Sequence, residues 1–159
     1  MTVEAPLSKY KKQNYLIMIV LFWGLAVVFA YDGFLSKFEW SMRYSFYEKH
    51  VIDNGGKPDS DMVFNQKAAP VLGAAGLAAV IFYFFASKKK IIADDSKLTV
   101  NGFIIEYRNI EKINKTHFDK KGYFIITYTD NGQSKELKLS DRRYDNMPAV
   151  LDHIVAKIS

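Results

Sequence analysis

The chain has 159 residues, a formal net charge of +5 and no cysteine. The missing thiols exclude disulfides, thiolate catalysis and cysteine-based metal sites. Although 49% of the residues are hydrophobic, the mean hydropathy is close to zero, so apolar and polar residues are expected to be segregated along the sequence.

The first segment, residues 1–14, contains few apolar residues and is predicted to be an N-terminal cytoplasmic tail. Two uncharged runs follow, over residues 15–31 (YLIMIVLFWGLAVVFAY) and 68–86 (AAPVLGAAGLAAVIFYFFA). As helices they would be about 25 and 28 Å long, close to the ~30 Å hydrocarbon thickness of a bilayer. The sequence therefore predicts a transmembrane hairpin over residues 15–87.

Two other interpretations of these runs are open. Buried core helices of a soluble protein would need polar chain to cover them, but the rest of the sequence is a charged connection and a segment that already resembles a complete small domain. A cleaved signal peptide would agree with the loose likeness of Val28-Phe29-Ala30 to a cleavage site. The first run is, however, long for the apolar part of such a peptide.

Small residues recur along both runs at a spacing of four, which allows two helix backbones to approach closely in lipid. Packing of the two helices on each other explains this pattern, and docking on a foreign membrane subunit would use it equally well. The residues predicted to pack are Ala26, Ala30, Ala69, Gly73 and Gly76.

Charge predicts the orientation of the hairpin. Basic residues that flank its outer ends outweigh those between its helices, and the positive-inside rule then places both termini in the cytoplasm. Lys88, Lys89 and Lys90 also act as a stop signal beside anionic headgroups. The membrane-surface residues are Lys11, Lys12, Lys88, Lys89 and Lys90.

The connection, residues 33–66, is predicted to be external and to contain a short amphipathic helix. Leu35, Phe38, Met42 and Phe46 have helical spacing, and aromatic rings favour the headgroup zone. Phe38, Trp40 and Phe46 are the predicted interfacial aromatics; packing of this helix on a neighbouring subunit is the alternative. "DNGGKPDSD" follows as a loop.

Beyond Lys90 the apolar period changes from helical to alternating. Asn101-Gly102 and Asn131-Gly132 each separate two strand-like runs and predict tight hairpin turns. A further strand is predicted over residues 110–118, and a C-terminal helix is expected to begin near Asp145 or Asn146 as its cap. Its apolar stripe is formed by Val150, Leu151, Ile154, Val155 and Ile158.

The order of these elements, with the "IEKI" strand, the "KKG" turn and the closing helix, resembles the bacterial PH-like domains attached to membrane helices. The resemblance covers most of residues 88–159 and implies a cytoplasmic PH-like domain that binds or assembles rather than catalyses. The basic pattern by which many eukaryotic PH domains hold phosphoinositides is not visible here. The predicted fold is thus a membrane α-helical hairpin plus an α+β domain, an antiparallel PH-like curved sheet closed by a C-terminal helix.

Residues that could carry chemistry are sparse in the sequence. His50 is predicted to lie across the membrane from His117 and His153, so the three cannot form one metal site. Asp59 and Asp61 lack the calcium-loop pattern and are assigned to turn solvation. No nucleotide, nucleophile-elbow or zinc-protease motif is present. We therefore predict no catalytic, metal or cofactor site, and no nucleic-acid binding, because basic residues are interspersed with acids.

These patterns favour a non-catalytic integral protein of a bacterial inner membrane. An accessory or scaffold subunit that docks its PH-like domain within a larger membrane complex fits best, with other membrane subunits or further copies of itself as partners. The alternative is a sensor or anchor that responds to anionic lipid through its basic face. A channel or enzyme is disfavoured, since no ionisable residue lies at mid-depth in either run.

Overall fold

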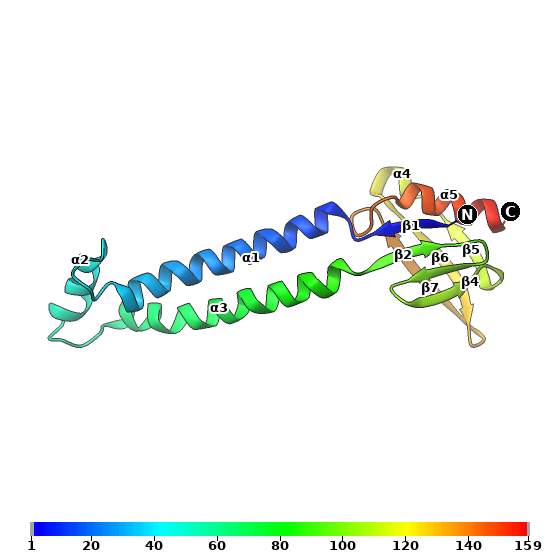
Figure 1. Cartoon of the computed structure of the whole chain (residues 1–159). Helices are drawn as coiled ribbons and strands as arrows, with labels where there is room; N and C mark the ends of the chain where they lie inside the picture. The colour runs from blue at the N-terminus through cyan, green and yellow to red at the C-terminus, as the bar shows by residue number, and fades with distance from the viewer. Residues whose placement is uncertain (1, 159) are drawn as a thin grey trace. The chain divides into compact units, whose positions relative to one another are not determined.

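A computed structural model describes residues 2–158 of the chain, which divide into two compact units. Residues 15–83 form one, the helical unit. The chain segments on either side of it, residues 2–14 and 84–158, together form the other, the sheet unit. The predicted mixture of two long apolar helices with an antiparallel α+β region is confirmed (Figure 1).

The helical unit is built on α1 (Lys9–Ala30) and α3 (Ser60–Ser87), which run side by side (Figure 1). Ring contacts between Tyr15 and Tyr83, and between Phe29 and Phe64, show that the helices are antiparallel. Both helices are long and apolar enough to cross a membrane. Only 11% and 17% of their most apolar windows are buried within the structure, whereas the core helix of a soluble protein is mostly buried.

Small residues allow α1 and α3 to pack closely at two positions along the helices, around Ala26 and Ala69 and around Gly76. Ala26 and Ala69 are buried. A Cβ at Gly76 would lie 2.8 Å from the indole nitrogen of Trp23, so glycine leaves the space that the ring fills. Gly73 has no such neighbour, because a Cβ there would meet no atom within 4 Å. Ala30 is half-buried.

The connection between the helices consists of three short helical turns: η1 (Tyr31–Leu35), α2 (Tyr44–Tyr47) and η2 (Glu48–Ile52). The predicted amphipathic helix is wrong in extent, since its first part folds as turns and Met42 is 91% exposed. The buried Ser41 hydroxyl accepts the Arg43 N–H at 3.2 Å, a local bond that competes with helix formation. Arg43 also forms two 2.9 Å bonds to the Asp32 carboxylate.

The sheet unit holds two antiparallel sheets. The first has the order β1-β2-β3-β4, and the second has the order β5-β6-β7. Their bounds are β1 (Val3–Pro6), β2 (Lys90–Ala93), β3 (Lys97–Val100), β4 (Phe103–Glu106), β5 (Ile110–Asn114), β6 (Tyr123–Asp130) and β7 (Gln133–Ser140), with η3 (Tyr107–Asn109) between the sheets and α4 (Phe118–Lys121) before β6.

Both predicted Asn-Gly turns are confirmed. In each, the asparagine and the glycine have positive φ, at 53° and 92° for Asn101 and Gly102 and at 51° and 77° for Asn131 and Gly132. These angles match the twist of the flanking strands, which pair directly across each two-residue loop. The predicted alternation in β7 is confirmed as well, because Leu139 is buried while Lys138 is exposed.

The N-terminal segment contributes a strand that the sequence analysis did not identify. β1 pairs antiparallel with β2, and Ala5, opposite Ile91, is fully buried. Ser8 then caps α1, since its hydroxyl accepts the Lys11 N–H at 3.2 Å. The two chain segments that flank the helical unit are therefore neighbours in one sheet.

The C-terminal helix α5 (Met147–Ile158) packs on β1 and β2 and contributes buried residues to the core. Of its predicted apolar stripe, Val150, Leu151 and Ile154 are buried, whereas Ile158 is 39% exposed. The side chains of Asp145 and Asn146, which were expected to cap α5, bond to the N-terminal segment instead. Asp145 accepts the Lys9 N–H at 3.1 Å, and Asn146 donates to the Glu4 carbonyl at 3.1 Å. Both side chains thus hold the N-terminal segment in place.

The strand predicted over residues 110–118 ends early, at Asn114. The Asn114 side chain accepts the Thr116 N–H at 3.1 Å, and this turn removes the following residues from the ladder. The short helix α4 follows, and Gly122, whose φ is 67°, caps its C-terminal end. A side chain there would also collide with the Asp141 carboxylate.

Candidate functional sites

A groove of about 270 Å³ runs between an edge strand and the last helix of the sheet unit. β5 forms one wall and stands at the edge of its sheet. Within residues 2–158, no neighbouring strand pairs with the outward backbone groups of β5. The other wall is the C-terminal end of α5. The groove is lined by Ile110, Glu111, Lys112, Ile113, Lys115, Val155 and Ile158.

The groove combines an apolar floor with cationic side chains. Glu111 is directed to the neighbouring strands, because it accepts hydrogen bonds from the hydroxyls of Thr129 and Ser134. Lys112 and Lys115 are exposed. An extended segment with apolar and acidic side chains therefore has matching chemistry for this surface.

Ion pairing and burial hold the α5 wall in position. The Lys157 ammonium lies 2.7 Å from the Asp95 carboxylate. The hydrogen bond that Lys157 donates is the main cause that lowers the pKa of Asp95 to about 2. One turn earlier, His153 bonds the Asp94 carbonyl at 2.8 Å. The Tyr107 hydroxyl reaches the same carbonyl, and burial raises the pKa of Tyr107 to about 12.

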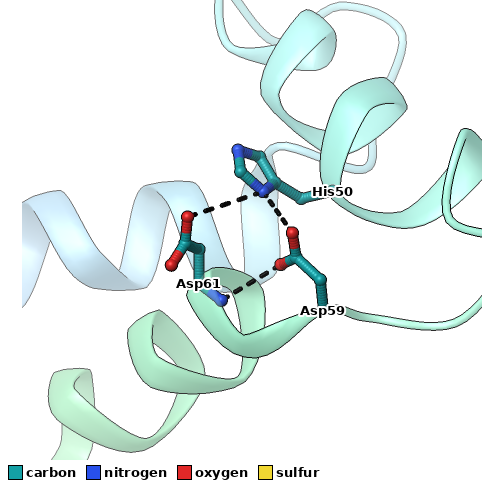
Figure 2. Close-up of side chains that lie close together, drawn as sticks. All are labelled: His50, Asp59 and Asp61. Atoms are coloured by element: carbon teal, nitrogen blue, oxygen red, sulfur yellow. Dashed lines mark hydrogen bonds and ion pairs between the residues drawn. The ribbon is translucent and has the colours of Figure 1, made fainter.

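A second cluster lies in the helical unit, where the connection meets α3 (Figure 2). The His50 ring nitrogen Nδ1 lies 2.7 Å from one Asp59 carboxylate oxygen and 3.9 Å from an Asp61 carboxylate oxygen. The His50 side chain is 9% exposed, whereas that of Asp61 is 71% exposed. The cluster is thus closed on the histidine side and open on the Asp61 side.

Asp59 also serves as the cap of α3. Its second carboxylate oxygen accepts the N–H groups of Met62 and Asp61 at 3.0 and 3.1 Å. The Met62 bond, together with the bond to His50, lowers the pKa of Asp59. The sequence analysis had treated His50 and the two aspartates separately. Their proximity follows from the loop at Gly55 and Gly56, both at positive φ, which turns η2 back towards α3.

The predicted membrane-surface lysines lie at the junctions of the two units. Lys11 is exposed and Lys12 half-buried in the first turns of α1. Lys88 and Lys89 are exposed, and Lys88 stands 4.1 Å from the ring centroid of Phe84. Lys90 begins β2 and forms a 2.8 Å ion pair with Glu4 of β1.

The predicted interfacial aromatics divide into two groups. Phe38 and Trp40 stack at 5.5 Å and are 40% and 69% exposed. Phe46 instead packs on the His50 ring at 4.2 Å. His117 and His153 belong to the sheet unit, apart from the cluster around His50.

Comparison with models of protein families, with curated proteins and with solved structures found no match.

Proposed function

We propose that this protein is a non-catalytic, two-span membrane protein that docks a PH-like domain against a partner subunit. In this proposal the helical unit crosses a bacterial inner membrane, both termini are cytoplasmic, and the sheet unit serves as the docking domain. The single observation that carries the docking role is the groove between the edge strand β5 and α5, with Lys112 and Lys115 at its rim.

The exposed apolar surface of the two helices supports the membrane assignment. Val20 of α1 and Val71 of α3 are 71% and 67% exposed. An apolar patch of this extent is unfavourable in water and is what a lipid-facing helix requires. The pairing of β1 with β2 supports a hairpin with both ends on one side of the membrane. The flanking lysines favour the cytoplasmic side for those ends.

The same pairing argues against removal of the first helix as a signal peptide. Cleavage after Ala30 would take β1 away and uncover the core beneath Ala5, which is fully buried. A PH-like identity is supported by the four-stranded and three-stranded antiparallel sheets followed by a helix that packs on the core.

The partner segment that we propose is an extended, acidic stretch of another membrane subunit. Strand addition to β5 would supply main-chain hydrogen bonds, the floor would receive alternate apolar side chains, and the lysines would meet the acidic ones. An exposed ion pair contributes about 0.2–1 kcal/mol, so replacing two attractions by repulsion would weaken binding by roughly tenfold or more.

Photocrosslinking of the full-length chain in its native membranes tests this proposal. A photoreactive amino acid is placed at Ile158 on the groove, or at Phe103, which is 45% exposed on β4 and lies outside the groove. The Ile158 position should give one adduct that maps to an acidic segment of a membrane protein. Lys112→Glu with Lys115→Glu should reduce this adduct about tenfold, and the charge-matched Lys120→Glu with Lys121→Glu should leave it unchanged.

Two results would refute protein docking at the groove. The first is an equal adduct yield from both positions, or equal effects of the two double variants. The second is protection of Lys112 and Lys115 from acetylation when the purified chain is moved from neutral to anionic nanodiscs without any partner. That second result would identify the anionic-lipid sensor instead.

A further inference from the structure

His50, Asp59 and Asp61 bring three potential metal-ligand atoms within 4.8 Å of one another. Figure 2 shows the imidazole directed at both carboxylates. The ring comes from η2, Asp59 immediately precedes α3, and Asp61 lies in its first turn. Phe46 covers the imidazole at 4.2 Å between ring centroids. The ring is therefore held in place by packing, whatever binds at its nitrogen.

The donor set selects a class of ion. An imidazole nitrogen with two carboxylate oxygens suits zinc and neighbouring first-row metals. Calcium and magnesium prefer sites made of oxygen alone. Three protein ligands with one open side also match the zinc sites that keep a position for water, and the 71% exposed Asp61 side chain stands at that open side.

The observed distances are close to those that such an ion requires. Two ligands about 2.1 Å from a tetrahedral zinc ion are roughly 3.4 Å apart. The His50 nitrogen lies 2.7 Å from an Asp59 oxygen and 3.9 Å from an Asp61 oxygen. To bind the ion, the distance to Asp59 must increase and the distance to Asp61 must decrease, each by less than about one ångström. Rotation of the exposed Asp61 side chain supplies the closing movement.

We propose that His50, Asp59 and Asp61 form a binding site for a divalent transition-metal ion of the zinc class. The ion takes the place of the 2.7 Å hydrogen bond between the His50 Nδ1 atom and the Asp59 carboxylate, and the proton of that bond is released to water. Because η2 and α3 contribute different ligands, the bound ion fastens the connection to the start of the second long helix. The site is independent of the docking groove, since no residue is common to the two.

The ligands can be changed without removing the helix cap. Asp59→Asn keeps a side chain that caps helices as well as aspartate does while removing the carboxylate. Asp61→Asn changes an exposed side chain. Asp61 contributes to the cap through its backbone N–H, which this substitution keeps. Asp53→Asn is the matched control, because Asp53 is an exposed aspartate of the same connection that lies outside the cluster.

The experiment measures Zn²⁺ binding to the full-length, chelator-treated chain in detergent micelles by competition with a chromogenic chelator. We expect one Zn²⁺ per chain. Asp61→Asn and Asp59→Asn should each weaken the affinity at least about tenfold, while Asp53→Asn should leave it within about twofold of the unchanged chain. Co²⁺ in place of Zn²⁺ should give visible absorption bands of a nitrogen- and oxygen-bound ion, lost in Asp61→Asn.

Circular dichroism confirms that each variant keeps its helices. The proposal is overturned if the unchanged chain binds no Zn²⁺, or if Asp61→Asn binds it as tightly as Asp53→Asn does. Displacement of Zn²⁺ by an equal concentration of Ca²⁺ would also overturn it, because a histidine-containing site cannot favour the harder ion.

Discussion

Substitution of Ala5 by a charged residue tests whether the N-terminal segment belongs to the core of the sheet unit. Ala5 is fully buried opposite Ile91, beneath α5. In Ala5→Asp a carboxylate without a partner is placed there, and uncompensated buried charges cost about 3–5 kcal/mol. A domain of this size changes its Tm by about 4–8 °C per kcal/mol, so we expect the Tm to fall by roughly 12 °C or more.

Its neighbour Glu4 provides the matched control, because adjacent residues of a strand point to opposite faces. The Glu4 side chain is 53% exposed and pairs with Lys90. Glu4→Gln removes a surface ion pair that contributes at most about 1 kcal/mol.

Thermal unfolding of the full-length chain in detergent is followed by near-UV circular dichroism, and hydrogen exchange of peptides from β2 locates the change. A Tm for Ala5→Asp within about 3 °C of that for Glu4→Gln would refute the placement of β1 in the core.

Three further predictions concern single contacts. Gly122→Ala should lower the unfolding free energy of the sheet unit by about 1–2 kcal/mol, since φ is 67° there; chemical denaturation measures this, and an unchanged midpoint contradicts it. Lys157→Gln should raise the pKa of Asp95 from about 2 towards 3.8, as NMR titration of the carboxyl carbon would show. Because the folded-state pKa of Asp95 is depressed, its pairing stabilises the fold above pH 3.8, and that contribution is lost as the pH falls towards 2. Gly76→Val should displace the Trp23 indole, whose nitrogen lies 2.8 Å from the added Cβ position, and an unchanged Trp23 environment by solvent-quencher accessibility would argue against this contact.

The elements that could be predicted from the sequence are those with a local cause. The two long helices follow from uninterrupted apolar runs, and the Asn-Gly hairpins follow from residues that accept positive φ. A strand of four residues such as β1 has no such pattern. It exists because β2, far along the chain, offers a pairing partner and α5 covers Ala5.

The candidate sites were harder to predict for the same reason. The groove depends on the separate placement of β5 and α5, although the alternation and the apolar stripe of these elements can be read from the sequence. The cluster forms only because the chain reverses between His50 and Asp59. A histidine followed, across a glycine-rich turn, by two aspartates is the local signal that could have indicated it.

The position of β1 ahead of the first long helix has a consequence for synthesis. During translation β1 is made before either long helix, whereas its partner β2 follows only after both helices have been made. For a chain that threads two helices through a bilayer, the sheet can be completed only when the second helix returns the polypeptide to the starting side. A nascent chain with one span misplaced would keep an open core and an unpaired strand, which quality-control proteases recognise as unfolded. In such a chain, completion of the sheet would therefore depend on the correct insertion of both helices.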